Sequence, residues 1–148
     1  MREILFRGKR LQGGEWVEGY FFKSDINKKE RESGKATMIF TPDCDTFIMV
    51  PECHNSFMVV SDTVGQYTGL KDKHGKRIFE GDILRWTGED GETGKVIVIF
   101  AGGSFLLKCV EVLDAPADPF DEFDRGGQTL EVIGNIHDNP ELLKGGEG

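Results

Sequence analysis

The chain has 148 residues, a formal net charge of −8 and a hydrophobic content of 38%. These values are typical of one ordinary folded domain, or of two small ones, and they exclude an intrinsically disordered chain. The 20 glycines and 11 phenylalanines favour a turn-rich β protein, because glycine accepts positive φ and aromatic rings fill pleated faces.

The charge is distributed unevenly along the sequence. Residues 1–110 contain 16 acidic and 16 basic side chains, whereas residues 111–148 contain 10 acidic side chains against only Arg125 and Lys144. General binding to a phosphate backbone needs clustered positive charge, so this distribution argues against nucleic acid as a partner.

Membrane insertion and secretion are not expected. No apolar run reaches the roughly 20 residues of a membrane helix, and the start MREILFRGKR lacks the apolar stretch and cleavage site of a signal peptide. Three irregularly spaced cysteines do not predict a disulfide framework, so we expect a reduced, cytoplasmic protein without membrane contact.

The first part of the chain predicts short strands separated by turns. Residues 2–7 and Trp16 to Phe22 are the first two strands, joined at Gly13-Gly14, and the apolar residues on both faces of the second suggest that it is buried on both sides at one end. Residues 24–35 are charged and predict an exposed loop. The segments ATMIF, TFIMV and SFMVV are further strands, with turns at TPDCD and PECHN.

The stretch VGQYTGLKDKHGKRIFEGDIL, residues 64–84, predicts a strand, a tight turn at His74-Gly75, a second strand and a sharp bend at residues 80–82. Strands near 64–68, 78–86, 95–100, 104–112 and 129–133 predict an SH3-type small β-barrel from about Val64 to Gly134. In NPELLK, Asn139 as N-cap and Pro140 as first helical residue predict a short C-terminal helical turn.

The predicted fold is therefore mainly β, in two parts. Residues 1–60 form an N-terminal β segment that packs on the barrel, and residues 61–148 form the barrel with an acidic loop and a C-terminal tail. The predicted core residues are Trp16, Phe21, Phe79, Ile83, Val96, Val98, Phe100, Leu106 and Val132.

Residues 64–84, together with FRGKRLQGGEWVEGYF upstream and EVIGNIHDNPELL downstream, resemble the YopX-like family of phage and prophage proteins. The resemblance implies a mainly β protein whose C-terminal part is an SH3-type barrel, and a viral or prophage origin. It implies no established biochemical activity, so no catalytic residue is carried over.

Cys44, Cys53 and His54 are the nearest approach to a metal site, with Asp43 or Asp45 as a fourth ligand. Tetrahedral zinc usually takes two close pairs of Cys or His, and neither Cys-x-x-Cys nor His-x-x-x-His is present. We therefore favour turn residues and a small buried thiol, and we expect neither a cofactor nor an enzymatic activity. Cys109 is predicted to be a core residue.

The predicted hairpin carries Lys71, Lys73, Lys76 and Arg77. Beside an exposed Tyr67, Trp16 or Trp86, these cations would form a weak binding site for single-stranded nucleic acid. The favoured alternative is a solvated hairpin whose lysines protect a sheet edge.

The segment DAPADPFDEFD surrounds two phenylalanines with negative charge, a pattern that suits docking on a partner. Its candidate interaction residues are Asp114, Asp118, Phe120, Asp121, Glu122, Phe123 and Asp124. The alternative is a surface loop whose phenylalanines fold back onto the barrel. Our leading hypothesis is a non-enzymatic protein-interaction module with a host or phage protein as partner, and exposed sheet edges leave a homo-oligomer open.

Overall fold

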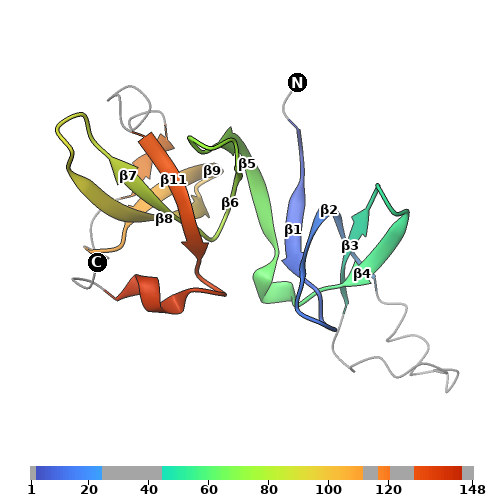
Figure 1. The fold of residues 1–148 in the computed structure, drawn as a ribbon. Coiled ribbons are helices and arrows are strands. Elements are labelled where there is room, and N and C mark those ends of the chain that lie inside the picture. The colour runs from blue at the N-terminus through green and yellow to red at the C-terminus, as the bar shows by residue number, and fades with distance from the viewer. Residues whose placement is uncertain (1–2, 25–44, 112–116, 121–128, 145–148) are drawn as a thin grey trace, which may run out of the picture. The chain divides into compact units, whose positions relative to one another are not determined.

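The computed structural model describes residues 3–24, 45–111, 117–120 and 129–144. The chain divides into two compact units, Met1–Gln66 and Tyr67–Gly148, where the sequence analysis placed a division after residue 60. Both units consist mainly of antiparallel β-strands, so the predicted mainly β class is confirmed (Figure 1). Within the described ranges, no helix is long and apolar enough to cross a membrane.

The N-terminal unit contains four strands joined in chain order and the beginning of a fifth, with neighbours in the order β4-β3-β2-β1-β5. Their bounds are β1 (Phe6–Lys9), β2 (Trp16–Lys23), β3 (Thr46–Val50), β4 (Asn55–Met58), the 3-10 turn η1 (Ser61–Thr63) and β5 (Gly65–Lys71). The predicted strands TFIMV and WVEGYFF are confirmed, whereas β1 begins later than the predicted residues 2–7. The predicted strand ATMIF lies outside the described residues.

The sheet of the N-terminal unit curls until the end of β4 meets the end of β1. Arg10 and Val59 form an isolated antiparallel bridge, the Leu11 amide donates to the Met58 carbonyl at 2.9 Å, and the Val60 amide donates to the Lys9 carbonyl at 2.9 Å. Ile48 and Val59 are almost fully buried on the inner face. These two hydrogen bonds at the closure therefore join backbone groups.

Glycine permits the tight curl at one position in particular. A Cβ on Gly19 would collide with the carbonyl oxygen of Met49 on the neighbouring strand. That atom belongs to the backbone and cannot turn aside as a flexible side chain would. The residue type at position 19 is therefore fixed by the close approach of β2 and β3.

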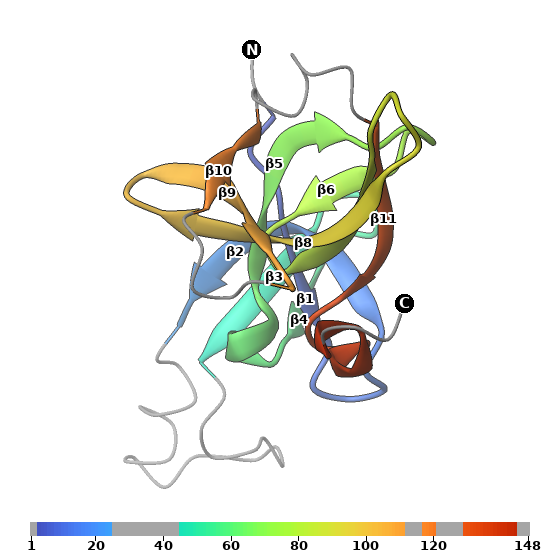
Figure 2. The same cartoon turned by 90° about the vertical axis from the view of Figure 1, so that its left-hand side faces the viewer.

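The C-terminal unit contains the rest of β5 and two groups of strands. β5 pairs with β6 (Arg77–Phe79), and a five-stranded antiparallel sheet has the order β10-β9-β8-β7-β11. The bounds are β7 (Asp82–Thr87), β8 (Thr93–Ala101), β9 (Ser104–Cys109), β10 (Asp118–Pro119) and β11 (Thr129–Asn135). The predicted strand 78–86 is divided at Gly81, which has a φ of 90°. In Figure 2, β8 and β9 run side by side, as their register requires.

The core of the C-terminal unit lies on one face of the five-stranded sheet. It consists of Ile78, Leu84, Val96, Val98 and Leu107, each at most 2% exposed. Phe79 and Ile83 are also buried, as predicted, while the predicted core residues Trp16, Phe21, Leu106 and Val132 are half-buried.

The prediction that Phe100 is a core residue is wrong, since it is 48% exposed. It alternates correctly with Val96 and Val98, but it lies at the turn between β8 and β9, beyond the last core layer. There its ring contacts Phe105, with the two centroids 5.0 Å apart. Strand periodicity predicts the face that a residue occupies and says nothing of where the core ends.

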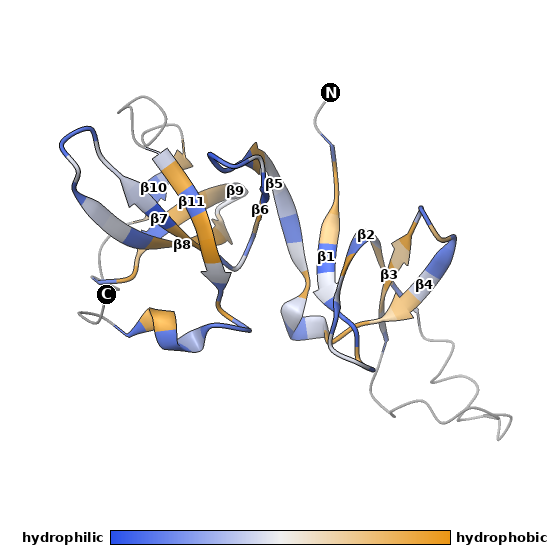
Figure 3. Cartoon of the chain, in the orientation of Figure 1, coloured by the Kyte–Doolittle hydropathy of each residue, from blue (hydrophilic) through white to orange (hydrophobic). Residues whose placement is uncertain are grey.

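The described strands form two antiparallel sheets and no closed barrel, so the SH3-type barrel stays a prediction. The predicted C-terminal helical turn is present as the 3-10 turn η2 (Pro140–Leu143), with Pro140 at its start. Asn139 is the N-cap residue of this turn, as predicted, but its side chain makes no capping hydrogen bond. Instead its Oδ1 accepts a hydrogen bond from the Asn135 amide at 3.3 Å. Figure 3 shows the polar turn between β7 and β8 in blue and the apolar β3 mainly in orange.

Candidate functional site

The hairpin between β5 and β6 is built on the sequence Asp72-Lys73-His74-Gly75. The Gly75 amide donates to the Asp72 carbonyl at 3.0 Å, and the Asp72 amide donates to the Lys76 carbonyl at 2.8 Å. Gly75 has a φ of 80°. Aspartate at the first position of a turn and glycine at the fourth are the residues that this geometry prefers, which confirms the predicted turn.

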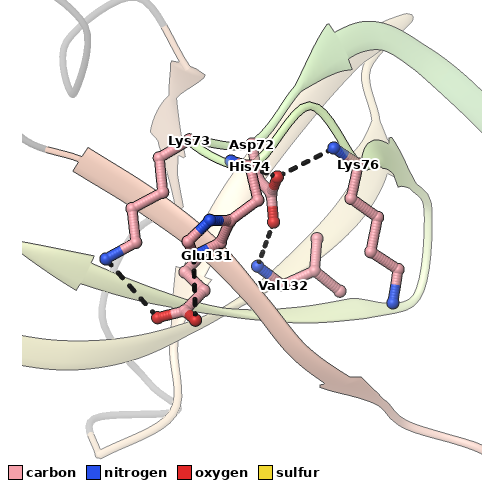
Figure 4. Close-up of polar contacts among 6 residues, drawn as sticks. All are labelled: Asp72, Lys73, His74, Lys76, Glu131 and Val132. Atoms are coloured by element: carbon pink, nitrogen blue, oxygen red, sulfur yellow. Dashed lines mark hydrogen bonds and ion pairs between the residues drawn. The ribbon is translucent and has the colours of Figure 1, made fainter.

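The carboxylate of Asp72 lies at the centre of the hairpin and also reaches β11 (Figure 4). Oδ1 accepts hydrogen bonds from the amides of His74 and Lys76, both at 2.9 Å, and Oδ2 accepts one from the amide of Val132 at 3.0 Å. Asp72 is only 9% exposed. Its carboxylate thus fixes the turn and ties it to a strand sixty residues further along the chain.

The electrostatics of Asp72 favour the ionised form. Burial raises the pKa of its carboxyl, but the hydrogen bonds from Val132, Lys76 and His74, together with the charge of His74, lower it more. The pKa therefore lies below the ordinary value for aspartate, as expected for a carboxylate that accepts several backbone hydrogen bonds.

Part of the basic cluster on the hairpin lies against a carboxylate. Lys73 Nζ lies 3.6 Å and His74 Nε2 3.4 Å from the carboxylate of Glu131, while Figure 4 shows the side chain of Lys76 pointing away from it. The guanidinium of Arg77 lies 5.8 Å from the ring centroid of Tyr67. Glu131 is distant from the hairpin in the sequence, so these ion pairs could not be predicted before the fold was known.

Two of the aromatic residues named for the nucleic-acid alternative, Tyr67 and Trp86, belong to the C-terminal unit and are not exposed there. Tyr67 is 4% exposed, so it does not meet the condition that the nucleic-acid alternative sets, and Trp86 packs against the core of the C-terminal unit. Trp16 belongs to the other unit, where Arg7 lies 4.6 Å and Lys9 5.8 Å from its ring centroid.

The predicted acidic interaction loop falls largely outside the described residues, which exclude Asp114, Asp121, Glu122, Phe123 and Asp124. Asp118 is exposed on β10, which pairs with β9. Phe120 is half-buried and packs against the core cluster. The Phe120 ring therefore packs onto the C-terminal unit, as expected if the phenylalanines of this segment fold back.

The candidate metal ligands are only partly described. Cys53 and His54 are exposed in the turn between β3 and β4, and His54 has a φ of 56°. Cys44 lies outside the described residues. Among the residues that are described, no group of three or more His, Cys, Asp or Glu could hold a metal ion. Cys109, predicted to be core, is half-buried, and its thiol lies 3.2 Å from Oε2 of Glu111.

An exposed apolar surface on the N-terminal sheet was not identified from the sequence. We call it the outer aromatic face, and it consists of Tyr20, Phe22, Phe47, Met49 and Met58. Tyr20 is paired with Met49 across β2 and β3, and Phe22 with Phe47. The Phe22 and Phe47 rings stack with centroids 5.2 Å apart and an interplanar angle of 10°.

The exposure of this face corrects the prediction that β2 is buried on both sides at one end. Tyr20 is 53% exposed and Phe22 is 40% exposed. The signal in the sequence was the alternation in WVEGYFF, which places apolar residues on both faces of one strand. This alternation does not indicate whether a second layer of structure covers the outer face of the strand.

The structure thus defines a class of mainly β proteins built from small antiparallel sheets, and the comparisons with known proteins specify the family. The profile of the YopX protein family matches residues 5–144, so the chain belongs to this family and the resemblance read from the sequence is confirmed. The crystal structure of protein EF1440 from Enterococcus faecalis is similar, with a TM-score of 0.52 and 26% sequence identity over 97% of this chain and 100% of that chain. The comparison with curated proteins found no match.

Proposed function

We propose that this YopX-family protein is a non-enzymatic protein-interaction module that binds its partner through the outer aromatic face. The observation that carries the proposal is the exposure of Tyr20 and Phe22 beside the stacked ring of Phe47. Clustered exposed aromatic residues are typical of protein interfaces, whose centres are rich in tyrosine, phenylalanine and methionine.

The chemistry of the face favours a protein partner with an apolar surface. None of its five residues carries a charge at neutral pH, so it offers no ionic contact to a phosphate backbone. Met49 and Met58 flank the aromatic rings in the strand register, and flexible thioether side chains adapt to the shape of a partner.

The acidic loop remains a proposed second contact, through Asp118 and the candidate residues beyond the described ranges. A phage or prophage origin, an SH3-type barrel in the C-terminal unit, and a host or phage protein as partner in the cytoplasm complete the proposal. The sequence resemblance supports the origin and the barrel, and the excess of acidic residues in 111–148 supports the second contact.

Binding of single-stranded nucleic acid by the hairpin is the alternative, and it has less support because Lys73 and His74 face Glu131. It predicts salt-sensitive binding of an oligonucleotide that Lys73→Glu with Lys76→Glu abolishes. Fluorescence anisotropy at low ionic strength tests it, and an unchanged signal on adding wild-type protein excludes it.

The experiment for the interaction module is affinity capture from a lysate of prophage-bearing cells, with nuclease treatment. The test variant is Tyr20→Ser with Phe22→Ser, and the matched control is Leu70→Ser, which removes a 46% exposed side chain from β5. We expect a nuclease-resistant protein partner to be captured by the wild type and the control and lost with the double variant. Equal capture by a folded double variant would overturn the assignment to this face.

A further inference from the structure

The strand β11 has one edge in the five-stranded sheet and one edge against the hairpin of residues 72–76. Along the first edge it pairs with β7, with Leu130 opposite Trp86 and Val132 opposite Leu84. On the opposite edge the Leu130 carbonyl accepts a hydrogen bond from the Lys73 amide at 2.9 Å, and the Val132 amide donates to Asp72 Oδ2 at 3.0 Å.

These two hydrogen bonds correspond to bonds that two residues of an antiparallel neighbouring strand, two positions apart, would supply. An antiparallel neighbour would offer an N–H to the Leu130 carbonyl and a carbonyl oxygen to the Val132 amide. The hairpin offers the backbone N–H of Lys73 and, in place of the carbonyl, the carboxylate of Asp72. The hairpin therefore hydrogen-bonds two backbone groups of this edge, the Leu130 carbonyl and the Val132 amide, although it adds no strand to the sheet.

The hairpin covers the regular part of β11. The register with β7 shifts between Val132 and Gly134, and beyond this irregularity the Ile136 amide donates to the Gly81 carbonyl at 2.9 Å. Asp72 and Lys73 therefore bind the same part of β11 that could pair with a further strand.

We propose that the hairpin of residues 72–76 is a plug on the edge of β11, and that without the plug this edge pairs with β11 of a second copy of the chain. An exposed edge of hydrogen-bonding groups is a template for strand addition, and Leu130, Val132 and Ile133 give this segment a high β propensity. Identical strands pair antiparallel about a two-fold axis, so one sequence supplies both sides of the contact.

The charge of Glu131 selects the register of this pairing. If Glu131 lay opposite itself, two carboxylates would face each other across the strands, and like charges directly opposite are destabilising. With Leu130 opposite Leu130, each Glu131 faces Thr129 of the second copy. This is the register we expect.

The test variants are Asp72→Asn and Lys73→Pro in the full chain. The asparagine retains an oxygen for the two hydrogen bonds within the turn and presents an NH2 group to the Val132 amide, so it opens the plug and preserves the turn. The proline removes the backbone donor to Leu130 together with the exposed ion pair between Lys73 and Glu131, and Lys73→Ala controls for the loss of the side chain. The proline occupies the second position of the turn, where proline is favoured, and leaves all three acceptor contacts of Asp72 in place.

The matched control is Asp90→Asn. Asp90 Oδ1 accepts a hydrogen bond from the Glu92 amide at 3.1 Å in the exposed turn between β7 and β8. This aspartate stabilises a turn in the same manner, but its described contact is local.

Sedimentation velocity over a range of concentrations measures self-association. We expect at least about tenfold tighter self-association for Asp72→Asn and Lys73→Pro than for the wild type, Lys73→Ala and Asp90→Asn. Unchanged association of the two variants, shown to be folded by tryptophan fluorescence, would overturn the proposal. Hydrogen exchange in the wild type is an independent readout, because a Val132 amide that exchanges as fast as a solvent-exposed amide would show that the plug does not protect the edge.

Discussion

In both units a sheet edge is covered by another segment of the chain, but the groups that make the contact differ. In the N-terminal unit the end of β4 returns to the end of β1, and the contact is made by backbone hydrogen bonds around Arg10 and Val59. In the C-terminal unit β11 is covered by a hairpin that contributes one backbone amide and one buried carboxylate.

The two units depend on different residue types in the sequence. In the N-terminal sheet, the close approach of β2 and β3 depends on a missing side chain at Gly19. Closure by a carboxylate requires a buried charge that several N–H groups stabilise, so it depends on Asp72. Each unit carries one tryptophan, Trp16 or Trp86, and Trp→Phe variants allow the unfolding of each unit to be followed separately.

The largest effect is expected for Gly19→Val, because a Cβ there collides with the Met49 carbonyl oxygen. We expect the free energy of unfolding of the N-terminal unit to fall by about 3 kcal/mol or more. Urea denaturation of the Trp86→Phe protein, followed by Trp16 fluorescence, measures it. The control is Gly14→Ala, whose Cβ has space and whose cost is the strain of a positive φ, about 1 kcal/mol. Equal costs for the two variants would show that the close approach is absent.

Asp72→Ala is the corresponding change in the C-terminal unit. It leaves the amides of His74, Lys76 and Val132 without their acceptor, and we expect a loss of about 3 kcal/mol in the free energy of unfolding. Urea denaturation of the Trp16→Phe protein, followed by Trp86 fluorescence, measures the loss. An effect seen only through Trp16 in the Trp86→Phe protein would contradict the assignment of this contact to the C-terminal unit.

A smaller effect is expected for the loss of stability of the C-terminal unit as the pH falls. Because the folded-state pKa of Asp72 is lowered, its contribution is complete near neutral pH, declines below the ordinary aspartate pKa of about 4 and is lost once the pH falls below the folded-state pKa. The pKa of Glu111 is also lowered, since burial raises it less than the Cys109 thiol, neighbouring backbone amides and Lys95 lower it. Urea denaturation between pH 7 and pH 3 should therefore show a shallower acid limb for Asp72→Asn than for the wild type. Parallel curves would show that Asp72 is not the titrating group.

The smallest effect is expected for Lys73→Ala. Its ammonium lies 3.6 Å from Glu131, but the two side chains are 41% and 32% exposed, so water screens the pair. We expect a change of about 0.3 kcal/mol, which added salt reduces further. Thermal unfolding in low and high salt measures it, and a loss comparable to that of Asp72→Ala would mean that the ion pair holds the hairpin.

Several local features followed directly from the sequence, each because neighbouring residues determine it. The turn at residues 72–75 follows from aspartate and glycine in their preferred positions, and the bend at Gly81 from the need for a positive φ. The three blocks that resemble the YopX family likewise lie in continuous stretches of the chain, and the family profile confirms them.

The errors arise where the answer depends on packing between segments far apart in the sequence. Phe100 has the correct alternation for the core, but the core ends one layer before it. Tyr20 and Phe22 have the composition of buried residues, but the structure leaves their face exposed. The sequence likewise did not indicate that Glu131 from β11 lies beside Lys73.

The sequence by itself determined the β class, the positions of the turns and the family, because strand periodicity and turn chemistry act over a few residues. Only the tertiary structure decided which edges are covered and by what. Asp72 is one of 26 acidic residues, and its neighbours identify it as a turn residue without indicating a contact with β11. Its role depends on the Val132 amide, which the fold alone brings to within 3.0 Å of its carboxylate.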